Sequence, residues 1–280
     1  MTGKTVVCVV GTRPEAIKMA PVVLALRSQG YFDVKILATG QHAAMLDQAL
    51  GHFSLTADLN LHIMKERQSL DHITASVLTG AGEYFDAECP SAVLVHGDTT
   101  TTFASALAAF YRKIPVGHVE AGLRSGNMHL PFPEEMNRVL ADRITTWAFA
   151  PTELAKENLL REGTPEKMIH VTGNTVIDAL FYTVKSTSRP YCEDLDGLPE
   201  NAPFLLVTAH RRESWGKPLE DICTALTMLL DAHPELWMVI PMHRNPSVRE
   251  TIRKHLEKRD KVILCDPLDY PDFVWAMNAS

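Results

Sequence analysis

The sequence lacks the features of several large protein classes. No apolar run approaches the ~18 residues that a membrane-spanning helix needs. Lysine and arginine form no cluster, and the formal net charge is −7 with a pI of about 5.9, so the basic surface of a nucleic-acid-binding protein is missing. The five cysteines are scattered and none belongs to a CxxC pair. This usage is typical of reduced, mostly buried thiols in a cytoplasmic protein.

Short apolar runs alternate with longer segments of helical period. Runs that are apolar on both faces predict buried strands, and their alternation with helices predicts an α/β protein with a parallel, doubly wound sheet. The expected strands are residues 5–11, 34–40, 92–97, 115–122, 147–151 and 169–173. The expected helices are residues 14–30, 43–53, 102–113, 133–144, 152–163 and 174–184.

The 280 residues suffice for about two domains of ~100–200 residues each. A stretch rich in proline and charge, without periodicity, precedes a second series of strands near 204–208, 236–240 and 261–265, with helices from about Lys217 and Pro246. We therefore expect a first domain at 1–187, a linker at 188–203, and a second, incomplete α/β domain at 204–280.

Cations follow the first expected strand. The segment VVGTRPEAIK lacks the GxGxxG fingerprint, so a dinucleotide site is weakly supported. Arg13 and Lys18 instead lie beside the start of a helix, which is a plausible phosphate site. The alternative is that both cations pair with Glu15 and solvent.

Carboxylates follow the later strands. Asp98 precedes four threonines and is either the N-cap of the next helix or a ligand-facing residue at the carboxyl end of a parallel strand. Glu120 follows the next strand. Glu134 and Glu135 lie in the first turn of a helix, where the helix dipole alone also favours acids. Together these side chains predict a cleft that binds a phosphorylated ligand and transfers protons.

Two histidine–carboxylate pairs suggest a rival metal site. His96 and His118 each stand two residues before a carboxylate, on the same side of a strand. A metal-dependent hydrolase would use such pairs. Because both strands are predicted to be buried on both faces, a hydrogen-bonded core histidine is the favoured interpretation.

Longer motifs resemble a known family in order and spacing. They are GTRPEAIKMAP, QHAAMLDQ, VHGDTTTTFASALAAFYRKIPVGHVEAGLRSG, PFPEEMNR, VTGNTVIDAL and TAHRRES. They resemble the non-hydrolysing UDP-N-acetylglucosamine 2-epimerases of bacterial type over essentially the whole chain. The resemblance implies two Rossmann-like domains of glycosyltransferase-B type, no cofactor and no metal. It also implies a homodimer, and a C-terminal part that this chain lacks.

The resemblance also implies an activity and its residues. The family interconverts UDP-N-acetylglucosamine and UDP-N-acetylmannosamine for bacterial surface polysaccharides. It eliminates UDP to a 2-acetamidoglucal and adds UDP back after protonation on the other face. Carboxylates serve the proton transfers, while cations hold the departing diphosphate. The matching positions are Asp98, Glu120, Glu134 and His210 for catalysis, with Arg13, Lys18, Leu268 and Phe273 for substrate binding; Arg13, Lys18 and His210 best suit the phosphates.

Regulation is implied as well. Bacterial relatives bind a second UDP-N-acetylglucosamine as an allosteric activator, and the matching positions are Gln41, Arg67, Glu134, Arg211 and His243. Ala44 stands where some relatives have a longer polar residue, which predicts weaker activation. Residues 129–133, HLPFP, replace the family's usual Tyr-Ser-Pro-aromatic-Pro run beside Glu134.

Other functions stay open at this stage. A hydrolysing epimerase would release free N-acetylmannosamine and UDP. A truncated chain could be a catalytically weak nucleotide-sugar-binding protein. Product analysis distinguishes the hydrolysing from the non-hydrolysing epimerase, and an absence of conversion would favour the binding protein.

Overall fold

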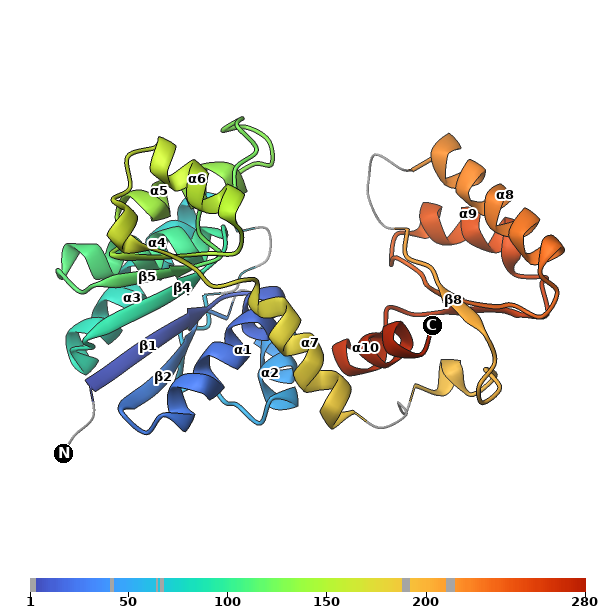
Figure 1. Ribbon diagram of the computed structural model, residues 1–280, viewed down its shortest axis with the longest axis horizontal. Helices are drawn as coiled ribbons and strands as arrows, with labels where there is room; N and C mark the ends of the chain where they lie inside the picture. The colour runs from blue at the N-terminus through green and yellow to red at the C-terminus, as the bar shows by residue number, and fades with distance from the viewer. Residues whose placement is uncertain (1–3, 41–42, 64, 66–67, 188–191, 210–214) are drawn as a thin grey trace. The chain divides into compact units, whose positions relative to one another are not determined.

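The computed structural model describes residues 4–40, 43–63, 65, 68–187, 192–209 and 215–280 (Figure 1). The chain divides into two compact units, Met1–Ala179 and Leu180–Ser280. This division lies before the expected domain boundary at 187. None of the described helices is long and apolar enough to cross a membrane.

The first unit contains a parallel sheet of seven strands in the order β3-β2-β1-β4-β5-β6-β7. Residues 6–10 of β1 are all buried, as expected for a strand covered on both faces. Val7 and Val9 pack against α3 and α4, so the alternate residues of β1 face the opposite side of the sheet. The strands are β1 (Lys4–Val10), β2 (Phe32–Ala38), β3 (Leu59–Asn60), β4 (Ala92–His96), β5 (Val116–Val119), β6 (Trp147–Ala150) and β7 (Ile169–Val171).

The helices of this unit alternate with the strands. The expected doubly wound α/β arrangement is confirmed, although α3 and the short β3 were not predicted. The helices are α1 (Arg13–Ser28), α2 (Ala43–His52), α3 (Leu70–Glu88), α4 (Thr100–Tyr111), α5 (Glu134–Arg143), α6 (Glu153–Arg161), the 3-10 helix η1 (Glu166–Met168) and α7 (Thr175–Ser186), which crosses the division between the units.

The second unit contains a smaller parallel sheet in the order β10-β9-β8. Its strands begin close to the expected positions, and α8 and α9 begin at the expected residues. The elements are the 3-10 helix η2 (Glu193–Leu195), β8 (Phe204–Leu206), α8 (Lys217–Ala232), β9 (Trp237–Pro241), α9 (Pro246–Leu256), β10 (Val262–Cys265) and α10 (Tyr270–Ala279).

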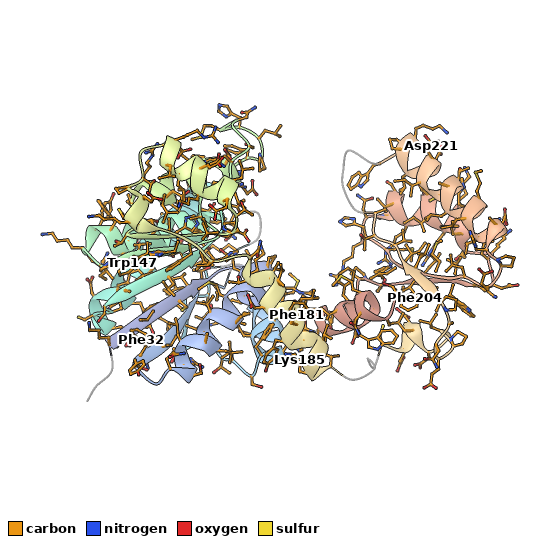
Figure 2. The ribbon with its side chains drawn as sticks, in the orientation of Figure 1. Phe32, Trp147, Phe181, Lys185, Phe204 and Asp221 are labelled. Atoms are coloured by element: carbon orange, nitrogen blue, oxygen red, sulfur yellow. The ribbon has the colours of Figure 1, made fainter. Side chains whose placement is uncertain are left out.

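The segment expected to be a linker contributes to the core of the second unit. Leu195 and Leu198 are buried in one cluster with Phe204, which is labelled in Figure 2. Trp275 of α10 stacks against Phe204 with ring centroids 6.3 Å apart. Residues 192–203 therefore pack onto the second unit, whereas their composition predicted a linker.

Candidate active site

A buried carboxylate organises the turn after β1. Glu15 is 3% exposed, and its Oε2 accepts hydrogen bonds from the amides of Gly11 (2.9 Å) and Thr12 (2.7 Å) and from the Thr12 hydroxyl (2.8 Å). Thr12 is the N-cap of α1 and completes a capping box with Glu15. The alternative that Glu15 pairs with Arg13 and Lys18 is wrong, because its partners are the turn and the threonines after β4.

The same carboxylate explains the threonine run. Oε1 of Glu15 accepts from the hydroxyls of Thr99 (2.7 Å) and Thr102 (3.1 Å). Thr99 is the N-cap of α4 and accepts from the amide of Thr102, so the prediction of an N-cap at Asp98 is wrong. Thr101 contacts Thr39 of the neighbouring β2 turn at 3.1 Å. The threonines thus join three strand ends by short hydroxyl contacts.

Asp98 is held by α5. Its carboxylate pairs with the guanidinium of Arg138, and its carbonyl accepts from the side-chain amide of Asn137 at 2.9 Å. The Asp98 side chain remains 30% exposed. It therefore lies oriented at the carboxyl end of β4, where open α/β sheets bind ligands. Neither Arg138 nor Asn137 was among the predicted site residues.

Glu120 lies at the centre of a second cluster at the end of β5, in a left-handed conformation with φ 68°. Nζ of Lys18 contacts its two carboxylate oxygens at 2.9 and 2.7 Å, and Nδ2 of Asn174 donates to Oε2 at 3.1 Å. His96 Nε2 lies 3.6 Å from the same oxygen. Burial raises the pKa of the Glu120 carboxyl, but His96 and Lys18 outweigh it and lower that pKa to about 2.

This cluster places two predicted residues together, Lys18 and Glu120, and adds Asn174, which was missed, and His96, which was considered only for the rival metal site. Lys18 was expected to bind a phosphate, and in the structure its ammonium forms an ion pair with the Glu120 carboxylate. Asn174 could have been suspected from its position between β7 and α7, at the carboxyl end of a strand. His96 is buried, and neither of its ring nitrogens has a hydrogen-bond partner among the described residues. Arg13, the first residue of α1, is partly exposed.

His118 belongs to a separate buried network. Its Nδ1 lies 2.6 Å from Oδ1 of Asp142, and its Nε2 lies 2.7 Å from the carbonyl oxygen of Gly97. The other oxygen of Asp142 accepts from Gly122 N (3.1 Å) and from Arg124 (2.8 Å). His118 is therefore a hydrogen-bonded core residue, as the favoured interpretation held. Within the described residues no group of three or more side chains is arranged to hold a metal ion.

The two glutamates in the first turn of α5 differ in burial and in hydrogen-bond partners. Glu135 is buried, and its carboxylate accepts from the amides of Ser125 and Gly126 at 2.9–3.1 Å. Glu134 is partly exposed, and among the described residues its carboxylate has no hydrogen bond or ion pair. Glu135 therefore fixes the loop after β5, and Glu134 remains available to a ligand.

Comparisons with known proteins identify the family of the chain. A protein-family profile described as UDP-N-acetylglucosamine 2-epimerase matches residues 24–280. The UDP-N-acetylglucosamine 2-epimerase of Salmonella typhimurium is 48% identical over 279 residues, which cover 98% of this chain and 74% of that protein. The chain belongs to this family.

Solved structures of family members share the fold. The UDP-GlcNAc 2-epimerase of Neisseria meningitidis, bound to UDP-GlcNAc, has a TM-score of 0.86 at 45% identity, covering 99% of this chain and 76% of that one. The Methanocaldococcus jannaschii enzyme in complex with UDP-GlcNAc and UDP has a TM-score of 0.72 at 32% identity, covering 97% and 76%. The two units therefore have the glycosyltransferase-B-like α/β fold of the UDP-N-acetylglucosamine 2-epimerases, and the chain is assigned as an isomerase.

The remaining predicted residues of this family member belong to the second unit or to undescribed positions. Leu268 is 8% exposed within the core cluster of α10, and Phe273 packs against that cluster. Nδ1 of the exposed His243 accepts from the amide of Asn245 at 3.1 Å. Four predicted site residues lie outside the described part of the chain: Gln41, Arg67, His210 and Arg211.

Proposed function

We propose that the chain interconverts UDP-N-acetylglucosamine and UDP-N-acetylmannosamine by eliminating UDP and adding it back, without hydrolysis. Family membership supports the epimerisation. The observation that carries the mechanism is the Glu120 carboxylate, which Lys18 and Asn174 hold at the carboxyl end of β5. A carboxylate fixed beside an ammonium and an imidazole can take a proton from carbon and pass it on.

Glu120 needs a change in its surroundings before it acts as a base. A carboxyl whose pKa is about 2 is a weak base at neutral pH. A diphosphate bound near Lys18 competes with Glu120 for that ammonium, and loss of the ion pair raises the pKa of the carboxyl. We infer that substrate binding makes Glu120 more basic by drawing Lys18 away, while His96 stays in place.

The other carboxylates are assigned to the opposite proton transfer. Asp98 is oriented by Arg138 and partly exposed, and Glu134 is the acid of the α5 first turn without a described partner. Arg13 is the best cation for the diphosphate, since the amides of Gly11, Thr12 and Glu15 at the start of α1 are already hydrogen-bonded. Phosphate binding at this helix therefore depends on the Arg13 side chain more than on backbone donors.

The test uses proton NMR of UDP-N-acetylglucosamine with the chain in deuterated water. We expect deuterium to enter C2 as the epimer forms, with no free N-acetylmannosamine. Glu120→Gln keeps the shape of the side chain and should lower turnover by at least ~100-fold, the usual size of a general acid–base contribution. Glu83→Gln, at an exposed position of α3, is the matched control. Free sugar as the main product would establish a hydrolysing enzyme, and near-normal turnover of Glu120→Gln would remove Glu120 from the mechanism.

Regulation and assembly remain predictions from the family resemblance. UDP-N-acetylglucosamine is expected to act also as an activator through Gln41, Arg67, Glu134, Arg211 and His243, and His210 is expected at the phosphates. A homodimer and a cytoplasmic location are expected on the same grounds.

A further inference from the structure

The hydrogen bonds of His118 determine how many protons its ring carries. Nε2 faces the carbonyl oxygen of Gly97, which can only accept a hydrogen bond. Nδ1 faces a carboxylate oxygen of Asp142, whose second oxygen accepts from Gly122 and Arg124. A neutral imidazole would direct a lone pair at one of these two acceptors. The Arg124 guanidinium favours the anionic form of Asp142, so the proton between ring and carboxylate belongs on Nδ1.

We infer that His118 is a buried imidazolium that acts as a positioning residue, holding the two turns that carry Asp98 and Glu120. The positioning of catalytic groups rests on the proposed function, whereas the protonation state does not. The Nε2 bond ends on Gly97, the residue before Asp98. The Nδ1 bond leads through Asp142 to the amide of Gly122, two residues after Glu120.

Both turns contain left-handed backbone conformations, which the glycines adopt without strain and Glu120 does not. Gly97, Glu120 and Gly122 have φ values of 71°, 68° and 83°. For Glu120, a residue with a Cβ, a left-handed conformation is strained. Hydrogen bonds from fixed, buried charges to both turns supply a reason why these conformations persist. His118 itself lies in β5, the strand that ends in the Glu120 turn, and β5 pairs with β4, the strand that ends in the Gly97 turn.

Charged and polar groups on three surrounding segments face His118 and its partner Asp142. Asp142 lies on α5, the Gly97 carbonyl on the β4–α4 turn, and Arg124 on the loop after β5, where it also pairs with Glu162. Burial lowers the pKa of His118, but Asp142 and Gly97 outweigh burial and raise it above the usual 6.5. Burial raises the pKa of Asp142, but His118 and Arg124 outweigh burial and lower it below 3.8.

The two shifts give the window in which the network stabilises the fold. The His118 contribution is complete below pH 6.5 and is lost as the pH rises through the higher folded pKa. The Asp142 contribution is complete above pH 3.8 and is lost as the pH falls through the lower folded pKa. The turns should therefore loosen on the alkaline side at the pKa of His118.

The first test is nitrogen NMR of the full chain labelled with 15N-histidine. We expect both ring nitrogens of His118 to be protonated at pH 7, with one titration step above 6.5. His118→Gln assigns the resonance by its disappearance, and His170→Gln on exposed β7 is the matched control. A neutral tautomer at pH 7 overturns the inference, whether or not the chain proves to be an epimerase.

The second test separates positioning from a merely structural role. His118→Gln can still donate one N–H toward Gly97 but has no charge. We expect kcat to fall roughly 10- to 100-fold, the cost of a misplacement of about 1 Å, with UDP affinity by calorimetry unchanged. The alkaline fall in wild-type kcat should be absent from the variant. A folded His118→Gln variant with wild-type kcat and the wild-type alkaline fall in kcat contradicts the positioning role.

If the variant does not fold, hydrogen exchange of the wild-type amides at 97–99 and 120–122 is measured against pH. Exchange that shows no added acceleration as His118 loses its proton overturns the inference.

Discussion

Replacing Glu15 by glutamine tests whether one carboxylate joins the turns after β1 and β4. Glu15→Gln keeps the size of the side chain and removes its charge. The two amides of Gly11 and Thr12 require an acceptor, so the glutamine oxygen takes the place of Oε2. The new NH2 group then faces Thr99 and Thr102. Those hydroxyls can rotate to accept, because a hydroxyl both donates and accepts.

The expected cost follows from the five hydrogen bonds that Glu15 accepts. A hydrogen bond to a charged group is worth about 1.5–3 kcal/mol, against about 0.5–1.5 kcal/mol for a neutral pair. Each of the three hydrogen bonds to the former Oε2 weakens by about 1 kcal/mol when the charge is removed. Rotation of the Thr99 and Thr102 hydroxyls offsets most of the loss at the former Oε1. The first unit is therefore destabilised by about 3 kcal/mol.

Hydrogen exchange is the suitable assay, because a chain of two units need not unfold in one transition. The opening free energy of amides in α1 and α4 should fall by about 3 kcal/mol, and that of α8 and α9 should not change. The control Glu83→Gln, on the exposed face of α3, should stay within about 0.5 kcal/mol. If Glu15→Gln matches the control, the Glu15 hydrogen bonds do not hold the turns together.

Two further variants test the backbone and the charge at the strand ends. Gly122→Ala would place a Cβ 2.4 Å from the carbonyl oxygen of Ala155. Hydrogen exchange of first-unit amides should show that the opening free energy falls by about 3 kcal/mol or more, because left-handed strain and steric overlap act together. Gly163 has φ +87° and no atom within 4 Å of an added Cβ, so Gly163→Ala should be destabilised only by left-handed strain, about 1–2 kcal/mol. Equal destabilisation by the two variants would show that the Cβ of Gly122→Ala does not overlap Ala155. Arg138→Met removes the partner of Asp98 and should lower turnover at least ~10-fold. Arg138→Lys keeps the positive charge and should retain part of the wild-type turnover. Wild-type turnover in both would exclude an oriented Asp98 from catalysis.

The sequence predicted most elements of the fold, and α3 shows why one helix was missed. Gly80 and Gly82 lower the helix propensity of this segment. Both glycines lie at close contacts: a Cβ on Gly82 would fall 2.6 Å from the Arg112 guanidinium, and one on Gly80 would fall 3.0 Å from Leu61. Tertiary packing of Val77, Ala81 and Phe85 stabilises α3 despite that propensity. These contacts cannot be read from local sequence.

The positions of the candidate site residues could be predicted from the sequence, but their partners could not. Asp98, Glu120 and Lys18 were predicted as site residues because strand ends of a parallel sheet carry ligand-facing residues. Their pairings join residues far apart in the chain, such as Lys18 and Glu120, which are 102 positions apart. Such pairs depend on the strand order, which places β1 beside β4 and β4 beside β5. A list of strands without their order does not fix these neighbours.

The charge balance of the first unit links binding to chemistry. Three cations at the strand ends are already paired: Lys18 with Glu120, Arg138 with Asp98, and His118 with Asp142. Under the proposed function, Arg13 meets part of the negative charge of a bound diphosphate, and one of these pairs can open to meet more of it. The His118 pair is buried, at 0% and 2% exposure, whereas the Lys18 ammonium is 23% exposed. Opening the Lys18 pair therefore costs less in desolvation than opening the His118 pair. Because His96 and Lys18 lower the pKa of Glu120, movement of the Lys18 ammonium to the ligand removes one of the two groups that weaken this base.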